Sequence, residues 1–234
     1  MTVDLGWIDG FAESIRPYVY VREHDNLLIL LPNQAYKLNP TGVVLLKRAL
    51  AGESIMSVVE EVAGSRASDE AVRQDVHEFF CDVRALVMGC LGDGKDRRAV
   101  EEAPFERPHN TLPVLSEVAL TYRCNLACRF CYAGCTCRSK RDYPEMSTDE
   151  VKRVLDIIRH DAEAPSVSWT GGEPTLRRDL VELTAHAASR GLRVNLITNG
   201  TNLTRAPVAA PKNAGLRSVQ VSLERHEAAL QRGI

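Results

Sequence analysis

The sequence lacks the long apolar runs that mark membrane and secreted proteins. Its longest aliphatic run, Leu27 to Leu31, is far shorter than the roughly 20 residues that a helix needs to span a bilayer. The segment from Met1 to Pro17 contains no continuous apolar stretch of the kind found in secretory signals. We therefore expect a cytoplasmic protein with no membrane partner.

An excess of charge of either sign is also missing. Lys and Arg together number 29 and Asp and Glu 31, which gives a formal net charge of −2. Proteins that bind nucleic acid usually carry a strong basic excess, so no nucleic-acid partner is expected. The sequence contains no internal repeat and no low-complexity tract, and its length suits one large or two small globular domains.

The cysteines are not spread along the chain as a disulfide framework would require. Two of the seven, Cys81 and Cys90, stand alone. The other five lie within fourteen residues: Cys124, Cys128, Cys131, Cys135 and Cys137. In a reducing cytosol so tight a group is more typical of a metal site than of disulfides.

Proline and charge between Gly92 and Pro113 predict a linker over residues 92–113, with one domain before it (1–91) and another after it (114–234). In the first domain we expect two strands at Tyr18–Arg22 and Asn26–Leu31 and a short third strand at Ala35–Leu38. Three helices follow, from Pro40 to near Gly52, from Ser54 to Gly64 and from near Ser68 onward. The pattern predicts a small α+β, winged-helix-like domain.

The second domain alternates strand and helix. Strands are predicted at 115–121, 166–169, 192–197 and 218–223, and helices at 147–161, 179–190 and, more weakly because of two prolines, 206–214. Repeated βα units imply an α/β fold with a parallel sheet, and such sheets bind ligands at the carboxyl ends of their strands.

The strongest chemical signal is Cys124, Cys128 and Cys131, which directly follow the first strand of the second domain. Three thiolates can hold three irons of a [4Fe–4S] cluster, which normally takes four cysteines, so that one iron would stay open. The alternative is zinc, whose sites usually pair ligands from separate segments. No second CxxC or HxxxH pair exists in the sequence, and this favours the cluster.

This C-x3-C-x2-C motif, with Phe130 before its last cysteine, resembles the signature of the radical S-adenosylmethionine (radical SAM) superfamily. The resemblance implies a partial (β/α) TIM-like barrel in which S-adenosylmethionine binds the open iron. It also implies an enzyme that, with electrons from a reductant such as flavodoxin or ferredoxin, forms a 5′-deoxyadenosyl radical to abstract hydrogen from a substrate.

Two further motifs fit the resemblance. Gly171-Gly172-Glu173-Pro174 follows the next strand; its glycines would let the backbone approach a ligand closely, and Glu173 can accept a hydrogen bond from an ammonium group. The resemblance assigns this segment to the methionine amino group of the cofactor. It likewise places Asn199, in Thr198-Asn199-Gly200, and Ser222 near the cofactor's ribose or carboxylate, although ordinary turn or surface roles remain open for both.

Three other cysteines are not expected to bind the cluster. Cys135 and Cys137 could bind a second metal or act as redox thiols. Nothing in the sequence supplies the remaining ligands of a second cluster, so we favour the simpler expectation that they only lie near the first one. Cys81, among helical apolar residues, is expected to be a small core residue.

The first domain resembles the peptide-recognition domain of peptide-modifying systems, of the chaperone type from pyrroloquinoline quinone biosynthesis. The resemblance implies that a precursor or leader peptide adds a strand at the hairpin edge near Tyr18–Arg22 and faces the third helix around Val76, Phe79 and Val83. The alternative, DNA binding, would need a basic third helix. That helix instead carries an acidic excess: Asp69, Glu70, Asp75, Glu78 and Asp82 against Arg73 and Arg84.

The second domain has four predicted strands, fewer than a complete barrel of this superfamily. We therefore expect a fragment, a truncated product or half of a split enzyme, whose open sheet exposes an edge and one apolar face. Two alternatives to an active enzyme stay open. One is a truncated, non-catalytic module that binds a peptide and a cluster, and the other is a metal or redox sensor.

Overall fold

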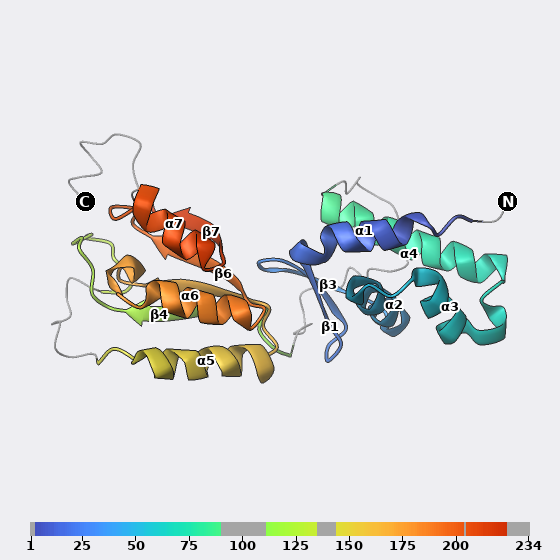
Figure 1. Cartoon of the computed structure of the whole chain (residues 1–234), viewed down its shortest axis with the longest axis horizontal. Helices are drawn as coiled ribbons and strands as arrows, with labels where there is room; N and C mark the ends of the chain where they lie inside the picture. The colour runs from blue at the N-terminus through green and yellow to red at the C-terminus, as the bar shows by residue number, and fades with distance from the viewer. Residues whose placement is uncertain (1–2, 90–110, 135–143, 204, 224–234) are drawn as a thin grey trace. The chain divides into compact units, whose positions relative to one another are not determined.

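A computed structural model describes residues 3–89, 111–134, 144–203 and 205–223. It divides into two compact units, Met1–Thr111 and Leu112–Ile234, each of which is described by itself (Figure 1). Most of the predicted linker over 92–113 lies outside the described residues. No helix in the described ranges has the combination of length and apolarity that a membrane span needs.

The first unit contains a three-stranded antiparallel sheet in the order β1-β2-β3. Its elements are α1 (Trp7–Ile15), β1 (Val19–Arg22), β2 (Leu27–Leu30), β3 (Gln34–Lys37), α2 (Pro40–Ala51), α3 (Ile55–Ala63) and α4 (Glu70–Met88). The predicted hairpin, short third strand and three helices are therefore all present. Helix α2 begins as the sequence indicates, with Asn39 accepting a hydrogen bond from Gly42 N at 2.7 Å, and it ends at Gly52.

Helix α1 was not predicted. Gly10 lies in its interior, where glycine disfavours a helix, and no side chain caps its first turn. Tertiary contacts compensate, because Ile8 and Ala12 are completely buried in the core of the unit. Asp9 in turn accepts a hydrogen bond from Ile55 N at 2.8 Å, so that α1 supplies a side-chain cap for α3, whose own Ser54 makes no capping bond.

The second unit is a four-stranded parallel sheet in the order β4-β5-β6-β7 with helices between successive strands. Its elements are β4 (Ser116–Thr121), α5 (Thr148–His160), β5 (Ser166–Gly171), the short turn η3 (Pro174–Leu176), α6 (Leu180–Ser189), β6 (Arg193–Thr198), α7 (Arg205–Asn213) and β7 (Leu216–Val221). The predicted α/β class is confirmed, and successive parallel strands joined by helices are how a partial TIM-like barrel is built.

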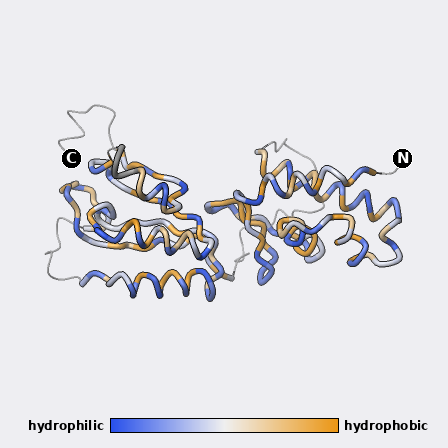
Figure 2. Tube along the Cα trace, viewed as in Figure 1, coloured by the Kyte–Doolittle hydropathy of each residue, from blue (hydrophilic) through white to orange (hydrophobic). Residues whose placement is uncertain are grey.

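One face of this sheet packs against helices. Val118, Trp169 and Leu196 lie on it and are buried against side chains of α5 and α6 such as Leu155 and Leu183. Figure 2 shows the matching alternation of polar and apolar residues along α5, which places its apolar stripe toward the sheet.

The opposite face of the sheet is mainly polar, with only Ala119 and Ile197 as apolar members among the rows described here, so it is not the exposed apolar face that was expected. The register aligns Ser168 with Asn195 and Asn195 with Ser218, while Thr170 and Gln220 extend this polar surface on the neighbouring row. Asn195 Nδ2 donates a hydrogen bond to Ser168 Oγ at 3.2 Å. Strand alternation explains the result, because most of the apolar residues of these strands lie on the helix-covered face.

Candidate functional site

The four predicted site segments all lie at the carboxyl edge of the parallel sheet. The cysteines follow β4, the Gly-Gly-Glu-Pro segment follows β5, Asn199 follows β6 and Ser222 follows β7. Ser222 is exposed, and its backbone N–H donates to Thr198 O at 2.9 Å, which holds it beside the end of β6. This edge is where parallel sheets bind ligands.

The three motif cysteines are partly buried, and none of them is in a disulfide. Cys131 N donates to Cys128 O at 3.3 Å, so these two residues share one turn, and Cys124 Sγ accepts a hydrogen bond from Leu126 N at 3.4 Å. Within the described residues, no three His, Cys, Asp or Glu side chains are arranged to hold a metal ion.

The chemistry of the donor set nevertheless suits an iron–sulfur cluster. Thiolates are the soft ligands that such clusters use, and each thiolate binds a different iron, so the sulfurs need not converge on one point. Cys135 and Cys137 lie outside the described residues, as does Cys90. Cys81 is partly buried in α4, where burial raises the pKa of its thiol, in keeping with an inert structural cysteine.

An ion pair joins Arg123 to Glu145, the two ends of the stretch 123–145 that carries the motif cysteines and that we call the cysteine segment. Residues 135–143 of this stretch lie outside the described residues. Arg123 Nε lies 2.6 Å from Glu145 Oε1, and the same carboxylate accepts a hydrogen bond from the hydroxyl of Thr121. The hydrogen bond from Arg123 is the main reason that the pKa of Glu145 is lowered. These contacts join the first and last residues of the segment that carries the motif.

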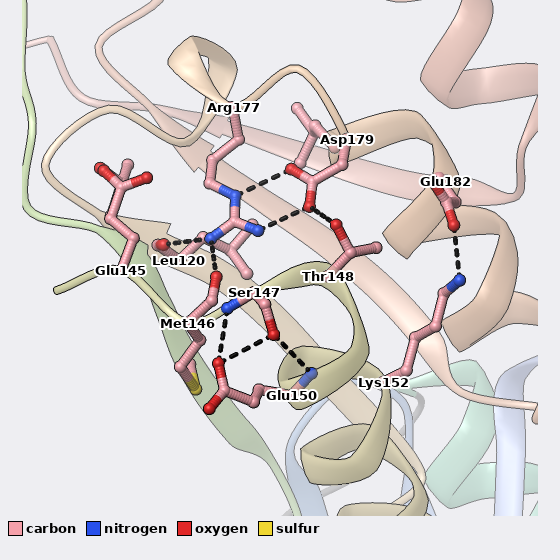
Figure 3. A network of polar contacts seen from close by, with 12 residues as sticks. Leu120, Glu145, Met146, Ser147, Thr148, Glu150, Lys152, Arg177, Asp179 and Glu182 are labelled. Atoms are coloured by element: carbon pink, nitrogen blue, oxygen red, sulfur yellow. Dashed lines mark hydrogen bonds and ion pairs between the residues drawn. The ribbon is translucent and has the colours of Figure 1, made fainter.

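A buried guanidinium anchors both flanks of that segment (Figure 3). Arg177 pairs with both oxygens of Asp179, at 2.8 and 2.6 Å. Its Nη1 donates to Leu120 O at 3.1 Å, in β4, and to Met146 O at 2.7 Å, just before α5. The cysteine segment is thus fixed at both flanks by a single side chain from the loop after β5.

This anchor makes a prediction about acid stability. The hydrogen bond from Arg177 lowers the pKa of Asp179 from 3.8 to about 2. Because the folded-state pKa is depressed, the stabilisation is complete above about pH 4 and is lost as the pH falls toward 2, by about 2 kcal/mol at most. We expect the difference in unfolding free energy between the unmodified chain and Asp179→Asn to shrink over this window.

Urea titrations at a series of pH values, followed by the fluorescence of buried Trp169 in a Trp7→Phe background, measure that difference. A matched control is Glu182→Gln, since Glu182 belongs to an exposed ion pair with Lys152. If the difference for Asp179→Asn is the same at pH 5 and pH 2, the ion pair does not contribute in the way described.

The two glycines after β5 allow one backbone to approach another. A Cβ at Gly171, whose φ is +132°, would lie 2.2 Å from Thr121 O, and a Cβ at Gly172 would lie 2.3 Å from Arg123 O. Gly172 N donates to Thr121 O at 2.7 Å, and Glu173 N donates to Arg123 O at 2.8 Å. The sequence predicted a close approach to a ligand; in the structure the glycines bring the end of β5 against the start of the cysteine segment.

Glu173 is completely buried, and its carboxylate is occupied by protein donors. Oε1 accepts hydrogen bonds from Thr175 N at 3.0 Å, Thr175 Oγ1 at 2.6 Å and Thr198 Oγ1 at 2.8 Å, and Oε2 accepts one from Asn199 N at 2.8 Å. Three of these bonds fall on Oε1 and only one on Oε2, and together they join the end of β5 to β6. Oε2 keeps a lone pair, so the ammonium contact expected from the sequence stays a prediction. Pro174 is also buried and opens η3.

Asn199 connects the end of β6 to the cysteine segment. Its Nδ2 donates to Asn125 Oδ1 at 2.9 Å and to Cys124 Sγ at 3.8 Å. Its Oδ1 accepts from Thr201 N at 3.0 Å and Thr201 Oγ1 at 2.6 Å. Sequence reasoning singled out Asn199 and missed the hydroxyls that surround the site, since a threonine in a turn carries no signal of its partners.

Comparisons with known proteins agree with this geometry. Residues 118–232 match the family model of the radical SAM superfamily. The chain is 42% identical over 119 residues to a PqqA peptide cyclase of Rhodopseudomonas palustris, which covers 51% of this chain and 31% of that protein. It is 40% identical over 105 residues to an Fe-coproporphyrin III synthase of Methanosarcina barkeri, which covers 45% of this chain and 26% of that protein.

The chain thus spans about a third or less of the length of these curated relatives. Among solved structures, Streptococcus suis SuiB bound to S-adenosylmethionine matches 92% of this chain and 48% of its own, with a TM-score of 0.58 and 17% identity. SuiB bound to the precursor peptide SuiA matches with a TM-score of 0.54 and 15% identity, over 92% of this chain and 49% of its own. These structures share the fold, and the match of residues 118–232 to the family model shows that the second half of the chain is a domain of the radical SAM superfamily.

Proposed function

We propose that this chain is part of a radical SAM enzyme that modifies a peptide. The observation that carries the proposal is the gathering, at one edge of a parallel sheet, of a three-cysteine segment bonded directly to the Gly-Gly-Glu-Pro and Thr-Asn-Gly segments. When bound, a [4Fe–4S] cluster and S-adenosylmethionine supply a 5′-deoxyadenosyl radical, with the electron coming from a reductant such as a flavodoxin or ferredoxin.

The residues of this chain would hold and shield that chemistry. Cys124, Cys128 and Cys131 bind three irons, and the backbone around Gly171 to Pro174, together with Asn199 and Ser222, borders the place of the cofactor. Glu173 acts there as a positioning residue, because its carboxylate is buried and bonded to the protein.

The polar face of the sheet is the side on which we place the substrate. Its side chains, among them Thr170, Asn195 and Gln220, offer hydrogen-bonding groups that a peptide backbone can use. Tyr132, the residue after the last motif cysteine, has its hydroxyl 3.2 Å from Thr170 Oγ1, so the cysteine segment reaches this face. A substrate bound there would lie next to the radical.

The first unit favours a peptide substrate. The region shared with the curated relatives occurs both in PqqA peptide cyclases and in an Fe-coproporphyrin III synthase, so it does not specify a substrate class. The likeness to SuiB, whose structure contains the precursor peptide SuiA, extends over 92% of this chain. A unit with an accessible sheet edge is suited to binding a leader peptide as an added strand.

β1 and β3 are the two edge strands of this sheet. The sequence favoured β1, whose Val19, Val21 and Arg22 are buried residues, so fewer of its side chains are available to a ligand. Gln34 and Ala35 of β3 are exposed at the other edge of the sheet. We therefore place the added strand at β3.

A hollow between α2, α3 and α4 offers a second contact for such a peptide. It has a volume of about 630 Å³ and is floored by apolar residues: Leu45, Val59, Val62, Val72, Val76 and Phe79. Its charged lining is mainly acidic, with Asp75, Glu78 and Asp82 against Arg66. An apolar peptide side chain flanked by lysine or arginine complements this lining.

The double variant Asp75→Lys, Glu78→Lys is expected to weaken binding of the precursor peptide by on the order of tenfold, since both side chains are exposed at the hollow and their charge is reversed. Fluorescence anisotropy with labelled candidate peptides encoded near this chain measures the affinity. The control Glu13→Lys, Glu60→Lys makes the same change of charge at two exposed positions outside the lining. Equal affinities of the double variant and the control would remove the hollow from the peptide site.

The activity itself is tested on the whole chain, purified without oxygen, reconstituted with iron and sulfide and reduced. We expect 5′-deoxyadenosine to form from S-adenosylmethionine, and its yield to change when the precursor peptide is added. A chain that binds both the cluster and the peptide yet forms no 5′-deoxyadenosine would be the non-catalytic binding module.

A further inference from the structure

One contact of the site ties a side chain to a motif sulfur. Asn199 Nδ2 lies 3.8 Å from Cys124 Sγ, within the range of a hydrogen bond to sulfur, and Leu126 N donates to the same sulfur at 3.4 Å. Asn199 comes from the end of β6 and Cys124 from the end of β4, so the contact is made across the sheet edge.

The orientation of this amide is fixed by its neighbours. Thr201 N is a backbone donor 3.0 Å from Asn199 Oδ1, which makes that atom the oxygen and turns the NH₂ group toward Cys124. Asn125 completes a closed ring of bonds, because its Oδ1 accepts from Asn199 and its Nδ2 donates to Thr201 Oγ1 at 2.7 Å. The backbone N–H of Asn199 is held in turn by Glu173.

The side chain of Asn199 has no hydrogen-bonding capacity left for a cofactor. An amide offers two N–H groups and two oxygen lone pairs. Asn125 and Cys124 take the two N–H groups, and the amide and hydroxyl of Thr201 take the two lone pairs. The contact with the ribose or carboxylate of the cofactor expected from the sequence would break one of these bonds.

We propose that Asn199 is a positioning residue for the cluster, whose amide donates a hydrogen bond to the Cys124 thiolate and thereby raises the reduction potential of the cluster. The inference rests on the proposed function. A donor to a ligating sulfur stabilises negative charge, and the reduced cluster carries one more negative charge than the oxidised one. Glu173, Asn125 and Thr201 hold the donor in place.

The test is a redox titration of the reconstituted whole chain, followed by the electron paramagnetic resonance of the reduced cluster. Asn199→Asp keeps the acceptor for Thr201 but removes the donor, so the midpoint potential is expected to become more negative while the iron content stays the same. Affinity for S-adenosylmethionine is measured on the same variants by calorimetry, so that an effect on the cofactor is separated from one on the cluster.

Asn202→Asp is the matched control, because it adds the same charge three residues further on, where Asn202 Nδ2 bonds to Thr175 Oγ1 at 3.0 Å. Its potential shift is expected to be clearly smaller. If Asn199→Asp does not assemble a cluster, Thr201→Val provides a second variant. It removes one of the bonds that orient the amide, and it is expected to shift the potential in the same direction by a smaller amount.

The outcomes separate this inference from the proposed function. A potential that is the same in Asn199→Asp and Asn202→Asp overturns the inference. So does a large loss of cofactor affinity at an unchanged potential, which would make Asn199 a cofactor ligand. An unmodified chain that assembles no cluster overturns the proposed function and the inference together.

Discussion

A chain in which Cys124, Cys128 and Cys131 are all replaced by alanine is expected to bind no iron–sulfur cluster. The three thiolates are the whole set of protein ligands that we propose, and a cubane cluster is not retained without them. After anaerobic reconstitution, iron and sulfide analysis should fall to background, the brown absorbance should be absent, and no 5′-deoxyadenosine should form. This is the largest effect expected of any change in the molecule.

Two control variants make the result specific. Cys81→Ala changes a partly buried cysteine of the first unit and should leave the iron content unchanged. The double variant Cys135→Ala, Cys137→Ala tests whether the neighbouring cysteines are ligands and should also retain four irons per chain, the content of one [4Fe–4S] cluster. Retention of a full cluster in the triple variant would refute the assignment of the motif cysteines.

Glu173→Ala is expected to lower the free energy of unfolding of the second unit by about 3–5 kcal/mol, because several buried donors lose their acceptor and each unsatisfied group costs about 1–3 kcal/mol. Thr198 and Asn199 are the donors most affected, since they link β6 to this carboxylate. Urea unfolding followed by Trp169 fluorescence in the Trp7→Phe background measures the loss. A loss of S-adenosylmethionine binding is expected to accompany it.

Glu182→Ala is the comparison, because this carboxylate forms an exposed ion pair with Lys152 and should contribute less than about 1 kcal/mol. Glu173 could act as a structural link between β5 and β6 or as a direct cofactor contact, and the two roles predict different effects on stability and on cofactor affinity. A residue that only contacts the cofactor would lose affinity and leave the unfolding curve of the cofactor-free chain unchanged. That pattern would show that the carboxylate is not the structural link described.

The elements of the fold could be predicted where the pattern is local. The capping box of Ser147 and Glu150 marks the start of α5, and it is present, with Ser147 N donating to Glu150 Oε2 at 2.7 Å. The strand-helix alternation places each site motif at a strand end, and a parallel sheet brings those ends to one edge. The meeting of the motifs at one edge therefore follows from the hydrophobic periodicity and from the order of strands and helices alone.

What could not be predicted depends on partners that are far apart in the sequence. Arg177 donates hydrogen bonds to Leu120 O and Met146 O, which lie 57 and 31 residues earlier in the chain. Contacts over such separations produce no recognisable pattern in the sequence. The donors to Glu173 are a residue at the end of β6 and residues of the adjoining turns, none of which signals its partner in the sequence, so the sequence suggested a free carboxylate. The polar face of the sheet was missed because a strand in isolation does not reveal which of its two faces the helices cover.

The one-sided core of the second unit has a thermodynamic consequence. Its buried apolar residues lie between the sheet and the helices, while the polar face contributes buried polar groups such as Ser168 and Thr170. Exposure of apolar surface raises the heat capacity of unfolding, and exposure of polar surface lowers it. The second unit should therefore have a smaller heat-capacity increment per residue than the first, whose own core combines helices with an antiparallel sheet. Its stability should consequently vary less steeply with temperature, in the cold as well as on heating.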